Sequence, residues 1–349
     1  MSSFGEVIIT GRVAAGMTQE DLANAIGVTQ AAMSRYENDL REPDADTTQQ
    51  IADALGVTVR FLERASRPTA ALAVDAHMRR RATAKPTVWR QLEAQLNMLR
   101  MHSDFLREEV ALAASLTMPG FDPFTTDPAD AARTTRTQWQ MPSGPARSIV
   151  RWIEAAGSVV LMTDLGNQRV DGLSQWTADH PVIVVNSANP TDRIRWTLAH
   201  EIGHLVLHRE DSTDDMEREA DAFAAEFLMP EILIRSELAN LTLGKAVDLK
   251  REWGVSVAAL IQRARQLGVL TDARRTSLFK QLSARGWRVR EPASDEIAPE
   301  KAELLNHIND HLRSRGLGDT DVAELAGYGS PDKNRLMPPR ARPLRAVSG

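Results

Sequence analysis

The chain contains no cysteine among its 349 residues. Disulfide bonds and cysteine-ligated metal sites are therefore excluded, so any zinc must be held by histidine and carboxylate side chains. Long apolar runs are missing as well, since none approaches the ~20 residues of a transmembrane helix. The first residues also lack the basic-then-apolar pattern of a secretory signal. We therefore expect a cytoplasmic protein that does not enter a membrane.

Aromatic residues are few, at 5% of the chain, but the remaining composition is ordinary. Hydrophobic residues make up 42% and charged residues 26%, which is typical of a folded globular protein and not of a disordered one. A chain of 349 residues is long enough for two or three domains with cores of normal size.

One five-residue motif carries clear chemistry. His200-Glu201-Ile202-Gly203-His204 has the H-E-x-x-H pattern of zinc peptidases. On an α-helix, residues four apart lie on one face, so His200 and His204 can bind one metal ion. Glu201 points to nearly the same side and can take a proton from a metal-bound water. Apolar residues at helical spacing occupy the opposite stripe, so we expect one buried face and one chemical face.

The third ligand is expected on a second amphipathic helix, Glu217–Pro230. A zinc peptidase needs one carboxylate on the metal and another that holds the far N–H of a ligand histidine. Glu217 and Asp221 lie one turn apart on one face, so we assign Glu217 to the metal and Asp221 to the histidine. Glu219 is the rival ligand, but it projects to another side and is expected to face solvent.

The surroundings of the motif suggest further roles. Val182–Val185 is predicted to be a buried strand, which could hold an extended substrate by edge pairing. His208 lies two turns beyond His200 and either polarises the scissile carbonyl or caps the helix, where a cation suits the dipole. Arg193 and Arg195 are expected to form structural ion pairs.

Taken together, these segments resemble the ImmA/IrrE family of metallopeptidases. The resemblance rests on Leu198–His204 followed by Glu217–Pro230, and it covers roughly residues 145–295. Upstream, Asp171–Ser174 and Asp192–Arg193 are similar to the family's approach to that helix. It implies a zincin-like domain that holds one Zn²⁺ per chain. It also implies cleavage of a repressor or similar regulatory protein, in phage, mobile-element, stress or toxin–antitoxin control.

Residues 1–66 predict a compact unit of five short helices. Thr18 and Thr29 are expected to cap the second and third helices. Met17–Ala23 and Val28–Asn38 resemble the Xre family of helix-turn-helix proteins. In that geometry the helix after the turn enters the major groove with its N-terminal residues leading. The expected DNA-contacting residues are Gln19, Thr29, Gln30, Ala31, Ser34, Arg35 and Asn38.

The charge of this unit argues against tight DNA binding. Residues 1–66 hold five basic and ten acidic side chains, a net charge of −5. DNA-binding proteins usually carry the opposite sign, because phosphate neutralisation supplies most of the affinity. Either a local patch around Arg35 and Arg41 suffices in a homodimer, or the unit binds protein partners.

Residues 67–120 are expected to form a linker. It contains a basic cluster, His77–Arg81 with Lys85, which is either a solvated segment or a DNA contact. A long amphipathic helix over Val88–Val110 follows. This helix either packs on its own catalytic domain or joins two copies of the chain.

Residues 121–295 are expected to form the peptidase-like domain, with about three strands before the metal-binding helix. Ala246–Leu267 has a helix-turn-helix shape, which we attribute to core packing. Residues 296–349 form a small helical extension and tail, and no internal repeat is evident. The expected fold is mainly α-helical with a small β-sheet, of the α+β class.

The leading hypothesis is a DNA-binding transcriptional regulator with a zinc-dependent endopeptidase domain. Its substrate would be a DNA-bound partner, such as a repressor or toxin-related protein, or the chain itself. The alternative is a regulator or antitoxin-like protein whose zincin domain senses a ligand or partner without catalysis. The intact Glu201 favours the enzyme, because a sensor does not need a general base. A third hypothesis is a housekeeping peptidase whose acidic helical domain recruits proteins.

Overall fold

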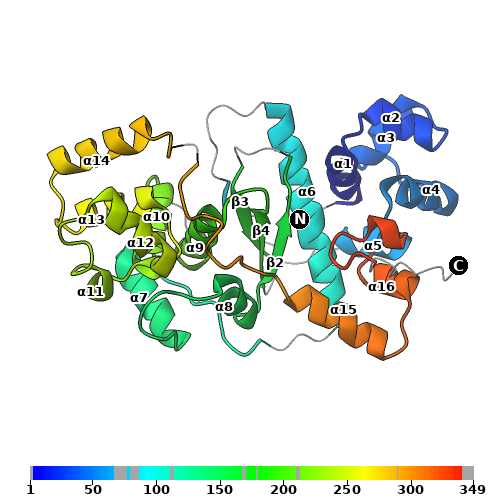
Figure 1. Cartoon of the computed structure of the whole chain (residues 1–349). Helices are drawn as coiled ribbons and strands as arrows, with labels where there is room; N and C mark the ends of the chain where they lie inside the picture. Colours follow the sequence, from blue (N-terminus) through cyan, green and yellow to red (C-terminus); the bar gives the residue numbers. More distant parts are fainter. Residues whose placement is uncertain are drawn as a thin grey trace, which may run out of the picture. The chain divides into compact units, whose positions relative to one another are not determined.

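The computed structural model describes residues 3–66, 77–78, 86–110, 114–166, 170–177, 180–209, 213–288 and 290–339. It divides the chain into two compact units (Figure 1). Unit 1 comprises Met1–Ala73, Ala84–Leu112 and Glu303–Gly349, and unit 2 comprises Val74–Thr83 and Ala113–Ala302. The four consecutive segments expected from the sequence are thus regrouped, because the long helix and the C-terminal extension both pack with the N-terminal helices. In the described ranges, no helix is long and apolar enough to cross a bilayer.

Unit 1 begins with five short helices, as predicted. Each begins after a serine, threonine or aspartate whose side chain accepts a hydrogen bond from the backbone of the first turn, and the predicted caps at Thr18 and Thr29 are confirmed. Val7, Leu22 and Phe61 are fully buried in their common core. The helices are α1 (Phe4–Ala14), α2 (Gln19–Ala25), α3 (Gln30–Glu37), α4 (Ala45–Leu55) and α5 (Val59–Ala65).

The long helix α6 (Pro86–Glu109) packs on α1 and α5. Its Met98, Met101 and Phe105 join the core of the first five helices. The Gln95 side chain donates a hydrogen bond from Nε2 to the carbonyl of Ala14 at 3.2 Å. The apolar stripe of α6 therefore packs within unit 1. The two roles expected for this helix were packing on the catalytic domain and joining two copies of the chain, and the described part of the structure shows neither.

The C-terminal extension repeats the first two helices of the chain. Its helices α15 (Leu304–Ser314) and α16 (Asp319–Leu325) have the bounds of α1 and α2 shifted by 300 residues. The glycines after each helix, at 16 and 316 and at 27 and 327, all have positive φ. Asp21 and Asp321 each accept a hydrogen bond from the backbone N–H three residues earlier.

This finding corrects the expectation that the chain has no internal repeat. Only five of the 27 aligned positions are identical, so the sequence alone does not reveal the relation; they are Ile308, Gly316, Asp321, Ala323 and Gly327. Where α3 would follow, the second copy has a single 3₁₀ turn, η1 (Pro331–Lys333). We call residues 303–337 the C-terminal repeat. It is a helix-turn-helix scaffold without the third helix.

Unit 2 contains a sheet in the order β1-β3-β4-β2, of which Figure 1 labels β2, β3 and β4. Because β4 is parallel to β2 and antiparallel to β3, it lies inside the sheet. The predicted buried strand is confirmed, but the expectation that it offers an edge to substrate is wrong. The strands are β1 (His77–Met78), β2 (Val159–Thr163), β3 (Gly172–Trp176) and β4 (Pro181–Asn186). The rest of the basic cluster, Arg79–Arg81 with Lys85, lies outside the described residues.

Helix α9 (Thr191–Leu207) is enclosed by the rest of unit 2. It packs against β3 and β4 on one side and against α7, α8 and α10 on others. Every residue from Thr197 to Leu207 is buried, so the face that carries the histidines is enclosed as well as the apolar face. The other helices are α7 (Pro128–Gln138), α8 (Ile149–Ala155), α10 (Met216–Leu228), α11 (Glu231–Ile234), α12 (Leu243–Trp253), α13 (Val257–Gln266) and α14 (Asp272–Ala284).

Ion pairs fix the first turn of α9. Arg193 pairs with Asp171 at 2.5 Å, and Arg195 pairs with the buried Glu300. The predicted structural role of the two arginines is confirmed. Asp192 is an acid in the first turn of the helix, and it accepts a hydrogen bond from the fully buried Lys250 at 2.8 Å. Helices α12 and α13 contribute to the main core of unit 2, as expected for the Ala246–Leu267 segment.

The packing of the C-terminal repeat predicts a difference between two glycine substitutions. Gly327 and Gly316 both have positive φ, but a Cβ on Gly327 would lie 2.6 Å from the Phe61 ring, whereas one on Gly316 would meet nothing within 4 Å. Gly316→Ala is expected to cost about 1–2 kcal/mol from backbone strain. Gly327→Ala should cost about 1–3 kcal/mol more through overpacking against α5.

Native-state hydrogen exchange at the amides of α5 measures this difference. Faster exchange in the Gly327 variant than in the Gly316 variant is the expected result. Equal exchange would mean that the C-terminal repeat does not support α5.

Candidate functional site

Helix α9 places two histidines of the H-E-x-x-H motif side by side. His200 and His204 are four residues apart, and their Nε2 atoms lie 3.0 Å from each other. Both side chains are only 1% exposed, so their orientation is set by packing on all sides. The sequence spacing therefore produces the paired donors that it predicted.

Helix α10 brings the third donor to this point. A Glu217 carboxylate oxygen lies 3.6 Å from His200 Nε2, and the other lies 3.4 Å from His204 Nε2. This approach requires Gly203, because a Cβ there would lie 3.0 Å from the Cα of Ala220 and 3.2 Å from the Cβ of Phe223. The glycine inside the motif thus allows α10 to lie directly against α9.

The arrangement fits a metal ion. Among the described residues, His200, His204 and Glu217 form a group whose donor atoms all lie within 4.8 Å of one another. Donors separated by about 3.0–3.6 Å can each lie about 2 Å from one ion, the bond length that zinc requires. The donor chemistry, two imidazoles and one carboxylate, is also that of catalytic zinc sites.

The charges around the cluster also favour a cation. Burial alone would lower the pKa of His200, but hydrogen bonds with Asp221 and Glu217 raise it to about 9. Hydrogen bonds from His200 and His204 in turn hold the pKa of Glu217 well below its usual range. The two carboxylates therefore stabilise a positive charge on His200, and a bound cation would place its positive charge at the same point.

Two hydrogen-bonded chains support the histidines from behind. Asp221 Oδ1 lies 2.9 Å from His200 Nδ1, the nitrogen that faces away from the cluster. His204 Nδ1 lies 3.1 Å from His208 Nδ1, and His208 Nε2 lies 2.8 Å from Glu219. Such outer contacts orient ligand histidines and fix which nitrogen carries the proton.

Glu219 differs from its expected position, whereas His208 is the C-cap residue of α9, the place that one of its two expected roles gave it. Glu219 does not face solvent, because it also accepts a hydrogen bond from the Thr213 hydroxyl at 2.7 Å. It does not reach the metal cluster either, since His208 stands between them. His208 is the residue at the C-terminal end of α9, and its ring contacts the far nitrogen of His204.

Glu201 is held by a residue that the sequence did not single out for a role. Its carboxylate, 1% exposed, accepts a hydrogen bond from the Ser174 hydroxyl of β3 at 2.5 Å. Gly172 of the same strand permits this contact, because a Cβ there would lie 2.5 Å from the Thr197 methyl of α9. No spacing rule connects a serine on a strand with a helix 27 residues away, so only the fold reveals the pair.

The residues expected to contact DNA lie on α2, on α3, in the turn between them and, for Asn38, at the C-cap of α3. Thr29 caps α3 by accepting a hydrogen bond from the backbone N–H three residues later. Gln30 Nε2 donates to Gln19 Oε1 at 3.4 Å, so the two glutamines form one polar group at the start of α3. The side chains exposed on α3 itself are Gln30, Ala31 and Arg35.

Other residues of this set serve the helix itself. Asn38 donates a hydrogen bond to the Ser34 carbonyl at 2.7 Å, which closes the end of α3. Glu37 is buried and accepts hydrogen bonds from Arg12 and Gln19. Because its partner Arg12 is basic, this pair is neutral, and the remaining four basic and nine acidic side chains of residues 1–66 still carry a net charge of −5.

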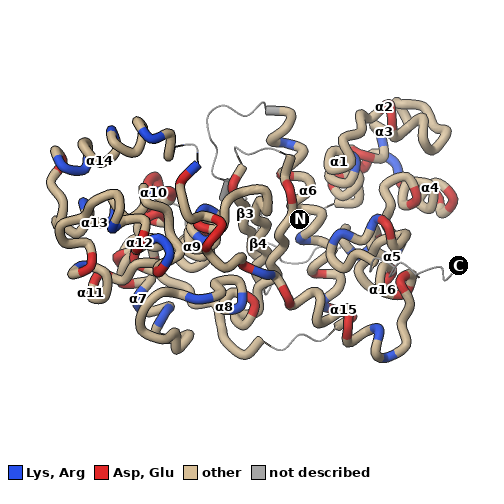
Figure 2. Tube along the Cα trace, in the orientation of Figure 1, with Lys and Arg blue, Asp and Glu red and all other residues tan. Residues whose placement is uncertain are grey.

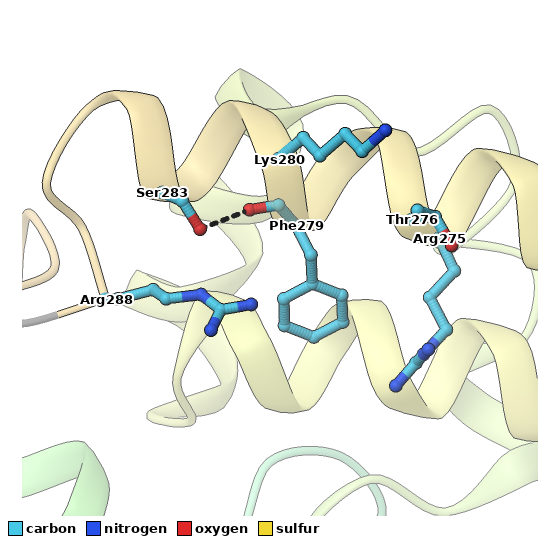
Figure 3. Close-up of a pocket in the computed structure, with 6 residues that line it drawn as sticks. All are labelled: Arg275, Thr276, Phe279, Lys280, Ser283 and Arg288. Carbon is cyan, nitrogen blue, oxygen red and sulfur yellow. Dashed lines mark hydrogen bonds between the residues drawn. The ribbon is translucent and has the colours of Figure 1, made fainter.

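A separate pocket of about 420 Å³ lies beside α14 (Figure 3). The Cζ atoms of Arg275 and Arg288 lie 5.1 and 5.9 Å from the centre of the Phe279 ring. Its six described lining residues include no histidine and no carboxylate, so this pocket is not the metal site. In Figure 2, Lys and Arg mark α14, whereas the acidic residues of the cluster lie on α10.

Comparisons with known proteins agree with both predicted modules. Residues 153–265 match the family described as IrrE N-terminal-like domain, and residues 8–62 match the family described as helix-turn-helix. The chain is similar to the radiation response metalloprotease IrrE of Deinococcus radiodurans, with 31% identity over 156 residues. This similarity covers 40% of the chain and 46% of the relative, which is less than half of either protein. The two family resemblances inferred from the sequence are confirmed.

The geometry predicts that two neighbouring glutamates behave differently toward the metal. Purified protein should hold about one zinc ion per chain. Glu217→Gln is expected to lose it, because the carboxylate is one of three donors, whereas Glu219→Gln should keep it. Asp221→Asn should weaken binding by about ten- to a hundredfold.

Metal content after gel filtration, and competition with a chelator, measure these changes. His200→Ala and His204→Ala serve as positive controls for loss. If Glu219→Gln loses the metal while Glu217→Gln retains it, the ligand assignment is wrong.

Proposed function

We propose that this chain, which joins a helix-turn-helix domain to an IrrE-like metallopeptidase domain, is a DNA-binding transcriptional regulator that also acts as a zinc-dependent endopeptidase. The observation that carries the proposal is the convergence of His200, His204 and Glu217 on one point, with Glu201 beside them on α9. Three protein donors leave a fourth zinc position for water, as in catalytic zinc sites. The alternative sensor role would not require Glu201.

The residues of unit 2 have distinct roles in the proposed reaction. His200, His204 and Glu217 hold the zinc, which when bound lowers the pKa of water and polarises the peptide carbonyl. Glu201 accepts the proton of the attacking water and delivers it to the leaving amine. Ser174 fixes one oxygen of Glu201, so the carboxylate keeps its orientation during both transfers.

Orientation of the two histidines comes from the groups behind them. Asp221 contacts Nδ1 of His200, and His208 contacts Nδ1 of His204 while resting on Glu219. These contacts keep each Nε2 directed at the metal. We assign His208 to this positioning role, because its ring touches the far nitrogen of His204.

The substrate is proposed to be a regulatory protein, either a DNA-bound partner or the chain itself. One observation favours the chain itself. The short strand β1 pairs with β3 in antiparallel register, with His77 opposite Ser174. A segment of this chain therefore lies along β3, the strand whose Ser174 bonds Glu201. This is the position that a substrate would take by strand addition.

The DNA-binding part of the proposal depends on α3. The exposed Gln30, Ala31 and Arg35 lie where a recognition helix meets the major groove. With a net charge of −5, one copy offers few phosphate contacts, so we propose a homodimer on an inverted repeat of double-stranded DNA. Because the apolar stripe of α6 packs within unit 1, dimerisation would need another surface. Action on DNA implies a cytoplasmic protein.

Catalysis is tested by two substitutions around the general base. Glu201→Gln should keep zinc and fold but reduce cleavage by about 10²–10⁴-fold, because an amide cannot accept the proton from water. Ser174→Ala should lower the rate less, since it removes only the group that holds the carboxylate. The measurement is cleavage of the chain itself and of purified candidate repressors, followed by mass spectrometry.

Zinc content of each variant is the control. A wild-type protein that holds zinc but cleaves neither its own chain nor any candidate would favour the sensor function. Cleavage by Glu201→Gln at the wild-type rate would exclude the assigned general base.

DNA binding predicts different effects for two residues of α3. Gln30→Ala should cost about 1–3 kcal/mol at one base pair of each half-site and relax specificity there. Arg35→Ala should weaken binding evenly across sequences and reduce its salt dependence, as expected for a phosphate contact. Gln49→Ala, on the exposed face of α4, is the matched control.

Binding assays on promoter DNA at two salt concentrations measure these effects. Absence of any sequence preference in the wild-type protein would leave a peptidase whose helical unit docks proteins. Sedimentation of the complex tests whether two copies bind.

A further inference from the structure

A cavity of about 250 Å³ lies inside unit 1, away from α3 and from the metal cluster. Its walls come from α1, the end of α4, the middle of α6 and the C-terminal repeat. Leu55, Met98 and Leu99 form much of its apolar surface. The cavity therefore exists only because the C-terminal repeat packs onto the N-terminal helices.

Backbone hydrogen bonds close this cavity. The N–H of Thr58 donates to the Gly327 carbonyl, and the N–H of Gly329 donates to the Gly56 carbonyl, both at 3.0 Å. Tyr328, between the two glycines of the repeat, forms a bridge with Val57. The repeat is thus attached to the turn between α4 and α5.

Two aromatic rings of the wall bring polar atoms into this buried region. The His102 ring is stacked 4.0 Å from Phe61 and 3.8 Å from Tyr328, measured between ring centres. His102 Nδ1 donates to the Ala326 carbonyl at 2.8 Å. Burial, helped by the charge of Arg335, lowers the pKa of His102 to about 3, so the ring is neutral.

The hydroxyl of Tyr328 has no hydrogen-bond partner in the described structure, although it is fully buried. Burial raises the pKa of Tyr328, so the group stays a protonated hydroxyl. The hydroxyl oxygen has almost no accessible surface, so it is enclosed by protein atoms and does not open onto the cavity. The cavity is several times the ~30 Å³ that one water occupies in the liquid, so there is room for more than a single water.

The charged residues of the wall are all basic. Lys333 and Arg335 line the cavity, and no lining residue is acidic. Across the described part of the chain, neither cation has an ion-pair partner, whereas Arg60, Arg64 and Arg313 of the same unit are all paired. The Lys333 stem passes over Gly56, because a Cβ on that glycine would lie 3.2 Å from Lys333 Cγ.

We propose that this cavity binds a small organic anion, with its charged group between Lys333 and Arg335 and its apolar part against Leu55, Met98 and Leu99. At about 250 Å³ the cavity is slightly smaller than sites for drug-sized molecules, which selects a compact carboxylate or phosphate monoester. Lys333 and Arg335 are exposed, and ammonium and guanidinium groups bind both carboxylates and phosphates through charge-assisted hydrogen bonds.

Occupancy would connect the two ends of the chain. The ligand would contact α1 and α4 on one side and the C-terminal repeat on the other, so its binding stabilises unit 1 as a whole. Because α3 belongs to this unit, the ligand is an effector for the proposed DNA-binding function. The binding step itself does not depend on that function.

The experiment uses the full-length protein with three probes of similar shape. Benzoate and phenyl phosphate carry the two candidate anionic groups, and benzyl alcohol is the uncharged control. Titration calorimetry and thermal denaturation should show binding of at least one anion, a rise in the unfolding temperature of unit 1 and little effect of benzyl alcohol. The better of the two anions identifies the chemical class.

Three variants connect this binding to the cavity. Combined Lys333→Gln and Arg335→Gln should weaken anion binding by about tenfold or more, because both cations are lost. Tyr328→Phe keeps the stacked ring and removes only the enclosed hydroxyl, so it should leave anion binding unchanged. Arg315→Gln, an exposed cation of the repeat outside the cavity, makes the same chemical change and should have no effect.

Several results would overturn the proposal. Binding of neither anion to the wild type would do so, as would equal affinity for benzyl alcohol, which would indicate an apolar void. Equal weakening by Arg315→Gln would reduce the effect to general charge attraction. Loss of DNA binding without loss of anion binding would instead contradict only the proposed regulator, which keeps the two proposals separable.

Discussion

The close approach of α10 and β3 to α9 is the constraint on which the functional site depends. Gly203 admits α10, and Gly172 admits β3, because a Cβ at either position would meet a neighbouring atom at 3.0 Å or less. These two contacts decide that Glu217 reaches the histidines and that Ser174 reaches Glu201. A helix enclosed in this way cannot keep a polar face in water, so each of its polar side chains needs a protein partner. The motif supplies the chemistry, and the packing supplies its geometry.

The two metal-facing histidines are supported by carboxylates in different ways, one directly and one through another histidine. Asp221 acts on His200 directly, while Glu219 acts on His204 only through His208. In both cases a carboxylate stabilises a proton on the nitrogen that faces away from the metal site, which leaves Nε2 as the lone-pair donor. Two acidic residues of one helix, two positions apart, therefore serve different histidines. Helix α10 can do this because its successive side chains project to different sides.

The packing of unit 1 likewise depends on contacts between segments far apart in the chain, the N-terminal helices and the C-terminal repeat. The C-terminal repeat copies α1 and α2 in length and glycine position, but neither of its helices begins at a capping side chain, and a 3₁₀ turn stands in place of the third helix. Its backbone bonds to the turn between α4 and α5 make the last described residues part of the DNA-binding unit. This arrangement explains why the linear order of segments does not match the compact units. It also produces a cavity in which the wall cations come from one end of the chain and most apolar atoms from the other.

The sequence by itself determined the features that depend on local spacing. These include the five N-terminal helices, the caps at Thr18 and Thr29, the pairing of His200 with His204 and the α+β class. Residues one helical turn apart must share a face, and a capping side chain reaches only its own first turn, so such features need no knowledge of the fold. The tertiary structure alone decided that Glu219 supports His208, that Ser174 holds Glu201, that β4 lies inside the sheet and that residues 303–337 repeat the N-terminus. Each of these depends on segments brought together across tens or hundreds of residues, and their contacts follow from close packing, which has no period along the chain.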